Sequence, residues 1–244
     1  MTKAVSATVI SIRKPMIENF KIPIPPLPIQ EEIVRILDTF TELTAELTAE
    51  LTARKKQYEY FRDKLLTFDD SVEVFNLKDV AKISNGKDHK HLEPGNIPVY
   101  GSGGVMRYAN GFIYDKSSVL IPRKGSIGNV FFVDEPFWTV DTIFYTKINV
   151  EKVLPKYFYY YLKTQQLEKL NTAAGVPSLT KAVLDRVKIP VPPLAEQERI
   201  VKILDKFDTL TNDITKGLPA EIEARQKQYE YYRDKLLTFK EKKA

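Results

Sequence analysis

The chain carries the stretch Lys21-Ile22-Pro23-Ile24-Pro25-Pro26-Leu27 and repeats it as Lys188-Ile189-Pro190-Val191-Pro192-Pro193-Leu194. Proline fixes φ and has no backbone N–H, so both copies are expected to be extended rather than helical. The repeat continues, since residues 30–38 match 197–205 and residues 56–68 match 227–239. The second copy holds four extra residues, because the offset between the copies grows from 167 to 171. This duplicated cassette predicts one helical structure that is built twice.

The similarity also extends upstream of the proline-rich stretch, where Ser11 and Lys14 align with Ser178 and Lys181. Residues 8–20 therefore resemble the end of a domain. We expect residues 1–29 to be the tail of a domain whose beginning is absent, followed by a proline-rich linker.

After each proline-rich stretch, which forms the entry to a cassette, apolar residues recur three or four positions apart. This spacing is typical of a helix with one apolar stripe. The repeat predicts helical spacers at residues 30–68 and 195–244, the first as a continuous helix over 30–66, about 55 Å long. A narrow stripe requires a partner helix, so we expect the two spacers to pair as an antiparallel coiled coil. An ordinary helical hairpin packed on its own core is the alternative. The expected seam consists of Ile33, Leu37, Phe40, Leu47, Leu51, Tyr58, Phe61, Ile200, Leu204, Phe207, Ile214, Tyr229, Tyr232 and Leu236.

Two local features modify these helices. Residues 44–47 and 48–51 form a tandem Thr-Ala-Glu-Leu, and one such unit would change the helix length by about 6 Å. This segment is therefore expected to set a distance. In the second spacer, Gly217-Leu218-Pro219 predicts a kink or a restart of the helix.

Residues 69–194 differ in character, with β-branched and aromatic residues separated by Gly, Asn and Pro, which favours short strands. We predict helices at 155–170, starting at Pro155, and at 178–185, capped by Ser178. The predicted strands are Val74 to Leu77, Ile97 to Tyr100, Ser118 to Ile121, Asn129 to Val133 and Thr142 to Ile148. The expected fold class is therefore α+β, with one α/β domain that contains a mixed, mostly short-stranded sheet, and two long helices.

Three polar stretches between these strands are candidate recognition loops: Ser84 to Gly95, Gly101 to Gly111 and Pro122 to Gly128. They offer side chains that can bind phosphates and reach base edges, although any single such residue is more often an ordinary solvated surface residue. The candidate DNA-binding residues are Lys87, His89, Lys90, His91, Ser102, Arg107, Tyr108, Asn110, Arg123, Lys124, Ser126 and Asn129.

Composition limits the classes of function. The 244 residues carry a formal net charge of +5, and residues 69–194 hold 16 basic and 13 acidic side chains. This mild basicity fits a polyanionic partner, but on charge alone an ordinary solvated surface fits as well. The absence of cysteine excludes disulfides and thiolate metal sites, and no apolar run of membrane-spanning length or signal peptide is found. A cytoplasmic protein without membrane contact is therefore expected.

The motifs of catalysis are missing. Asp88, His89 and His91 lack a third histidine or a glutamate at helical spacing, so we expect a surface loop and no metal. Residues 101–104 lack the lysine and hydroxyl residue of a phosphate-binding loop. The paired prolines of each entry lack the acid or amide and the aromatic residue of an adenine methyltransferase motif. We therefore assign no catalytic residue and no cofactor to the chain.

The repeated entry (189–201), the Lys-Gln-Tyr-Glu-Tyr motif, the Thr-Ala-Glu-Leu tandem and residues 97–104 together resemble the specificity subunit of type I restriction-modification systems. The resemblance covers nearly the whole chain. It implies that residues 69–194 form a target-recognition domain that reads one half of a bipartite site on double-stranded DNA. The helices would space the half-sites and dock methyltransferase (modification) subunits, which carry S-adenosylmethionine. Restriction subunits would join afterwards.

The chain departs from the full-length pattern because it holds one recognition domain instead of two. We therefore expect a half-length subunit, and a homodimer formed through the apolar stripes would present two identical domains to an inverted repeat. The alternative is an interaction or assembly protein, or an inactive cassette product, whose coiled coil binds partners while the central domain binds no DNA.

Overall fold

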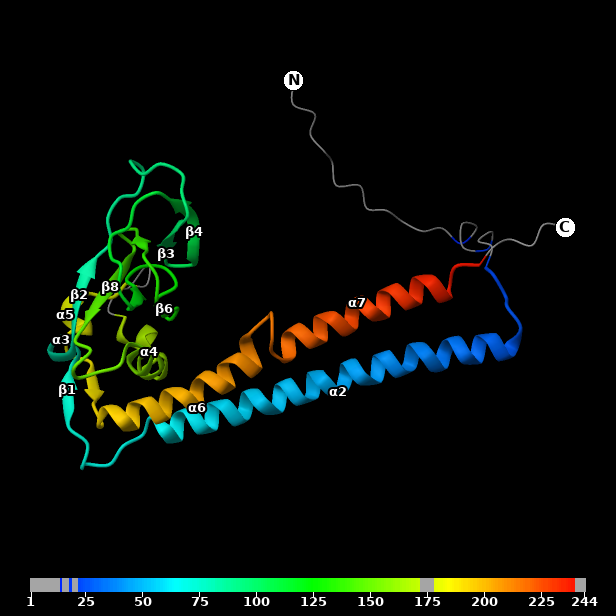
Figure 1. Cartoon of the computed structure of the whole chain (residues 1–244), viewed down its shortest axis with the longest axis horizontal. Helices are drawn as coiled ribbons and strands as arrows, with labels where there is room; N and C mark the ends of the chain where they lie inside the picture. Colours follow the sequence, from blue (N-terminus) through cyan, green and yellow to red (C-terminus); the bar gives the residue numbers. More distant parts are fainter. Residues whose placement is uncertain (1–13, 15–17, 19–21, 172–177, 240–244) are drawn as a thin grey trace, which may run out of the picture. The chain divides into compact units, whose positions relative to one another are not determined.

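The computed structural model describes residues 14, 18, 22–171 and 178–239 (Figure 1). The expected tail of a further domain falls almost entirely outside these residues. The chain divides into two compact units, one of residues 1–50 and 219–244 and the other of residues 51–218. The architecture confirms the expected fold class, with small sheets and long helices. No helix in the described ranges has the length and apolar character needed to cross a membrane.

In the described part of the first unit, two long helices lie side by side. Helix α2 (Leu27–Leu65) begins here and continues into the second unit, while α7 (Leu218–Leu236) runs beside it in the opposite direction (Figure 1). The rings of Phe40 and Tyr232 stack with centroids 5.3 Å apart. Helix α2 starts three residues earlier than expected because Pro28 lies in the first turn, where no backbone donor is required.

The predicted break in the second spacer is confirmed. Helix α6 (Leu194–Asn212) ends before α7 begins, and Asp213 organises the turn by accepting hydrogen bonds from the backbone N–H groups of Thr215 and Lys216 at 2.7 and 3.2 Å. At Gly217 the backbone is so crowded that a Cβ atom would lie 2.3 Å from the Thr209 carbonyl oxygen. The corresponding part of α2 is uninterrupted, so the four extra residues of the second cassette are accommodated in the interval that contains this break.

The described residues of the second unit form three small sheets. Strands β1 (Val74–Asn76) and β9 (Lys188–Pro190) pair antiparallel where the chain enters and leaves the domain. The second sheet has the order β2 (Ala81–Asn85), β8 (Ile143–Ile148), β5 (Ser118–Pro122) and β6 (Phe131–Val133), all antiparallel. The third has the order β4 (Gly104–Ala109), β3 (Ile97–Gly101) and β7 (Trp138–Thr139), in which β3 and β7 are parallel.

Several elements differ from those predicted from the sequence. Strands β2, β4, β7 and β9 and the short helix α3 (Leu77–Val80) were not predicted, and β4 lies inside a stretch expected to be a loop. The helix expected over 155–170 is divided into α4 (Pro155–Thr164) and the 3-10 helix η1 (Leu167–Leu170), because Gln166 has a φ of 45°.

The helix expected over 178–185 is shorter, since α5 spans Lys181–Leu184. The proposed cap Ser178 is wrong. The Thr180 hydroxyl oxygen accepts the hydrogen bond from the backbone N–H of Val183, whereas the Ser178 N–H donates to the side chain of Asn171.

The core joins the sheet to the helices. All five residues of β5 are buried, and Val119, Leu120 and Ile121 form a continuous apolar run within it. On α4, Tyr157 is fully buried and its hydroxyl donates to the Pro190 carbonyl oxygen at 2.8 Å. Gln197 of α6 is fully buried as well, accepting from the Leu154 N–H and donating to the Lys152 carbonyl. These contacts attach α6 rigidly to the domain.

Candidate nucleic-acid interface

The first candidate loop follows β2 and is held in place by two side chains. The indole N–H of Trp138 donates to the Lys87 carbonyl at 3.1 Å. The guanidinium of Arg107 donates to the carbonyl oxygens of His89 and Leu92 at 2.9 and 2.7 Å. Since these bonds connect positions far apart in the sequence, they give the loop a defined conformation.

The second candidate loop is mostly a β-hairpin. Strands β3 and β4 meet in a tight turn at residues 101–104, and Gly104 adopts a φ of 113°. The register pairs Val99 with Arg107 and Tyr100 with Val105, so Met106 is the extra residue of a β-bulge. A bulge redirects the side chain that it carries. Here the Met106 thioether crosses Gly101, where a Cβ atom would lie 2.5 Å from the sulfur.

The third candidate loop follows β5. The Arg123 guanidinium lies over the Phe144 ring at 5.0 Å, and the Arg123 carbonyl accepts from the Leu179 N–H at 2.8 Å. Gly125 adopts a φ of 78°, and a Cβ atom there would lie 3.3 Å from the Ser102 hydroxyl. The third loop therefore lies beside the turn of the hairpin.

The first and second loops enclose a hollow of about 690 Å³ together with the residues that precede β8. Met106 contributes apolar surface, and Asp88 and Asp141 contribute carboxylates. The Nδ1 atom of His89 is buried and has no hydrogen-bond partner among the described residues. The lining residues are Asp88, His89, Lys90, Gly101, Ser102, Gly103, Met106, Val140, Asp141 and Thr142.

The structure thus brings the three candidate loops to one region of the domain. Of the candidate DNA-binding residues, His89, Lys90 and Ser102 line the hollow. The exposed ones are Lys87, Lys90, His91, Tyr108, Asn110, Lys124, Ser126 and Asn129. Two of the cations have structural roles, because Arg107 holds the first loop and Arg123 covers Phe144.

Sequence reasoning overlooked part of this region. Trp138 and Asp141 lie in stretches that carried no motif, and Met106 gains its position from a bulge that no local pattern announces. Asp88 was considered only as a metal ligand. In the described residues no group of three or more potential metal-binding side chains is found.

The residues expected to form the coiled-coil seam are placed in both units. Ile33, Tyr58, Ile200 and Leu204 are buried. Leu37, Phe40, Leu47, Leu51, Phe61, Phe207, Tyr229 and Leu236 are half-buried, while Tyr232 is 40% exposed. Ile214 is the exception, because it lies in the break between α6 and α7 with 74% of its surface exposed.

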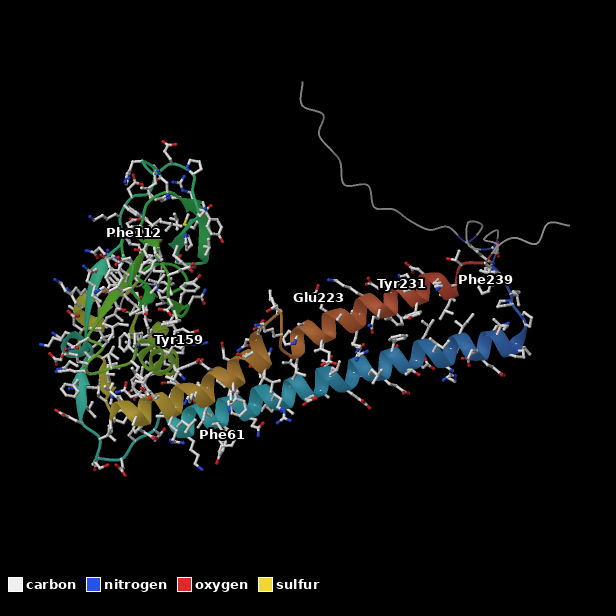
Figure 2. The ribbon with its side chains drawn as sticks, in the orientation of Figure 1. Phe61, Phe112, Tyr159, Glu223, Tyr231 and Phe239 are labelled. Atoms are coloured by element: carbon white, nitrogen blue, oxygen red, sulfur yellow. The ribbon has the colours of Figure 1, made fainter. Side chains whose placement is uncertain are left out.

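The side chains along α2 and α7 are drawn in Figure 2, where Phe61 projects from α2 and Tyr231 from α7. Tyr231 is 60% exposed, whereas its neighbour Tyr232 stacks on Phe40. Adjacent positions on a helix point in different directions, so only one of the two tyrosines belongs to the seam.

Comparison with known proteins assigns the family. The profile of the type I restriction modification DNA specificity domain matches residues 1–54 and 69–224. The chain belongs to this family. A putative type I restriction enzyme specificity subunit of Haemophilus influenzae is 39% identical, with 93% of this chain and 66% of that protein covered. The EcoR124I/EcoR124II specificity subunit of Escherichia coli is 40% identical, with coverage of 90% and 63%.

The chain therefore spans slightly less than two-thirds of these two relatives. A putative type I specificity subunit of Mycoplasma pneumoniae is closer in length, since the match at 33% identity covers 89% of this chain and 92% of that protein. Solved structures of the family share the fold. The S subunit of Mycoplasma genitalium superposes with a TM-score of 0.64 at 19% identity, covering 88% of this chain and 62% of that one. HsdS of Thermoanaerobacter tengcongensis gives 0.59 at 20%, covering 97% and 65%.

Proposed function

We propose that this chain is a sequence-specific DNA-binding subunit of a type I restriction-modification complex and that it has no catalytic activity of its own. The recognition domain, proposed at residues 69–194, reads one half-site of a bipartite target on double-stranded DNA. The observation that carries the proposal is the convergence of three loops, with exposed Lys87, Lys90 and Lys124, in a chain of the DNA specificity family.

The charges suit this role. Lysine ammonium groups neutralise phosphates and fix the register of a protein on a duplex, whereas shaped pockets and hairpins contact the base edges. A two-stranded ribbon is small enough to enter the major groove, and β3–β4 is such a ribbon. The rigid attachment of the domain to α6 through Gln197 would transmit the position of the helix to the bound half-site.

The helical spacers at residues 30–68 and 195–244 are proposed to dock modification subunits, which bring S-adenosylmethionine and the methyl transfer, and restriction subunits join that assembly. We place the complex in the cytoplasm. The tandem tetrapeptide lies in an uninterrupted part of α2, where the Thr44 and Thr48 hydroxyls donate to the carbonyl oxygens four residues earlier. This continuity supports a role in setting the distance between half-sites.

We also propose that two chains associate as a homodimer. The Phe40–Tyr232 and Phe61–Phe207 stacks are made within one chain, so the apolar stripes are already occupied. Other apolar side chains of the first unit are available, since Ile22, Ile24, Val34 and Leu237 are each at least 51% exposed. The repeat relates Ile22 to Ile189 and Leu237 to Leu66, which are 0% and 6% exposed in the domain core. A second copy that covers these side chains would supply the second recognition domain.

The experiment is selection from a pool of duplexes with a randomised centre, using the full-length chain at moderate salt. The proposal predicts enrichment of a short motif, because base contacts discriminate between sequences whereas phosphate contacts do not. Binding without enrichment, or no binding, contradicts it. The second outcome would favour the alternative function, an assembly protein whose helices bind partners.

A further inference from the structure

The hollow between the first two loops combines one exposed apolar group with carboxylates. The Met106 side chain is 59% exposed. In a regular strand, successive side chains point to opposite faces of the sheet, and the bulge at Met106 interrupts this alternation in β4. The bulge and the missing side chain of Gly101 bring its thioether to the wall of the hollow. This position of Met106 depends on two separate features, the inserted residue of the bulge and the glycine at position 101.

Two carboxylates line the same hollow. Asp88 is part of a local turn, with its Oδ1 facing the Lys90 N–H at 3.4 Å, whereas Asp141 lies exposed in front of β8. An ionised carboxylate only accepts hydrogen bonds, and near phosphates its charge is unfavourable. Towards a bound base, such a group is favourable where that base presents an amino group.

We propose that this hollow reads a cytosine from the major groove, with Asp141 accepting a hydrogen bond from the N4 amino group and Met106 packing against the C5 edge. The inference rests on the proposed function, since it presumes that the domain binds DNA. In the major groove, cytosine presents its N4 amino donor and its C5 edge, and no acceptor of its own. Guanine and thymine present acceptors, which the carboxylate repels, and adenine places the N7 acceptor beside its amino group, where Met106 offers no donor.

The β3–β4 hairpin and the hydrogen bonds of Arg107 to the first loop support this assignment. Arg107 is committed to the carbonyl oxygens of His89 and Leu92, so it fixes the wall of the hollow and is a positioning residue in this scheme. Ser102 lines the hollow and lies beside Gly125 of the third loop, where an added Cβ atom would be 3.3 Å from the Ser102 hydroxyl oxygen, and Gly125 follows the exposed Lys124. A phosphate bound by Lys124 would therefore lie on the same side as the hairpin that enters the groove.

The test compares the motifs selected from the randomised duplex pool by the full-length chain and by three variants: Asp141→Asn, Met106→Ala and Asp115→Asn. Asp115 is an exposed aspartate of the same domain outside the hollow, so its variant is the matched control. The unaltered chain and the control should select a motif with a fixed cytosine. Asp141→Asn should reduce the preference for cytosine at that one position by roughly 10-fold and leave the other positions unchanged.

Met106→Ala should weaken discrimination between cytosine and adenine at the same position. A second readout uses the selected duplex with 2-pyrimidinone, which lacks the amino group, in place of that cytosine. This replacement should weaken binding by the unaltered chain about 10-fold more than binding by Asp141→Asn. Thermal unfolding verifies that all variants are folded.

The outcomes separate the two proposals. If the unaltered chain selects no motif, the proposed function fails. If it selects a motif that Asp141→Asn and Met106→Ala leave unchanged, or one without a fixed cytosine, the function stands and the cytosine-reading hollow is refuted.

Discussion

The rings of Phe61 and Phe207 stack with centroids 5.7 Å apart and planes 24° from parallel. The repeat relates these positions to Tyr232 and Phe40, which stack at 5.3 Å and 22°. Each cassette thus contributes one ring to both stacks. The duplication visible in the sequence is therefore a duplication of contacts, with the same aromatic pair built once in each unit.

Removal of one stacked ring should destabilise the chain. Phe207 packs against the core and stacks on Phe61, so Phe207→Ala is expected to lower the free energy of unfolding by about 2–3 kcal/mol. Ile29→Ala provides the control, because Ile29 is 49% exposed and should change stability by less than about 0.5 kcal/mol. Urea unfolding followed by circular dichroism measures both, and equal effects would show that the stack is not a stabilising contact.

Gln197 and Gln30 form a natural pair for comparison. Both side chains donate to the carbonyl oxygen five residues earlier, at 2.8 and 2.7 Å. Gln197 makes two further bonds, to Leu154 and Lys152, and is fully buried. Gln197→Ala leaves these buried groups unsatisfied and should cost about 2–4 kcal/mol, against about 1 kcal/mol for Gln30→Ala. Similar losses in urea unfolding would argue against the role of Gln197 in attaching α6 to the domain.

Because the phenol of Tyr58 is buried, we expect the fold to become less stable at alkaline pH. Burial, the largest cause, and the nearby Asp208 charge raise the pKa of the Tyr58 phenol to about 12. Since the folded pKa lies above the ordinary value near 10, the neutral phenol contributes its full stability below about pH 10 and loses it as the pH rises towards 12. Tyr58→Phe should make the stability less dependent on pH in this window, whereas Tyr60→Phe, at a residue 61% exposed, should not.

Urea unfolding across this alkaline window measures the effect of both tyrosine substitutions. If the stability of Tyr58→Phe falls with pH as steeply as that of the unaltered chain, the phenol of Tyr58 is not the group responsible.

Deletion of residues 48–51 tests the distance-setting role of α2. The helix would shorten by about 6 Å, which corresponds to one or two base pairs at about 3.4 Å each. In an assembled complex, the number of base pairs between the two half-sites of the methylated target should therefore decrease, while the bases of the half-sites stay the same. Methylation-site mapping measures both the distance between the half-sites and their bases. An unchanged distance would refute the distance-setting role of α2.

The sequence predicted the helices well because a long apolar period and proline-rich entries are strong local signals. The break at Gly217 and the buried strand β5 followed from similarly local features. The hairpin was hidden because β4 begins with glycine and carries the polar Arg107 and Tyr108, so its strand character comes from pairing with β3. Contacts between residues far apart in the sequence also determine the geometry of the candidate site. Arg107 looked like a free DNA-binding cation, yet the first loop returns to it across fifteen or more residues.

DNA binding by the three loops is tested most directly by measuring DNA affinity against salt concentration, for the full-length chain and for the triple variant Lys87→Ala/Lys90→Ala/Lys124→Ala. Removing one lysine that neutralises a phosphate should reduce the slope of log K against log salt by about 0.9. We expect the slope to be lower by roughly 2–3 for this variant. It should not change for Lys55→Ala/Lys56→Ala, which removes two exposed lysines of α2. Equal slopes for all three proteins would contradict DNA binding by the three loops.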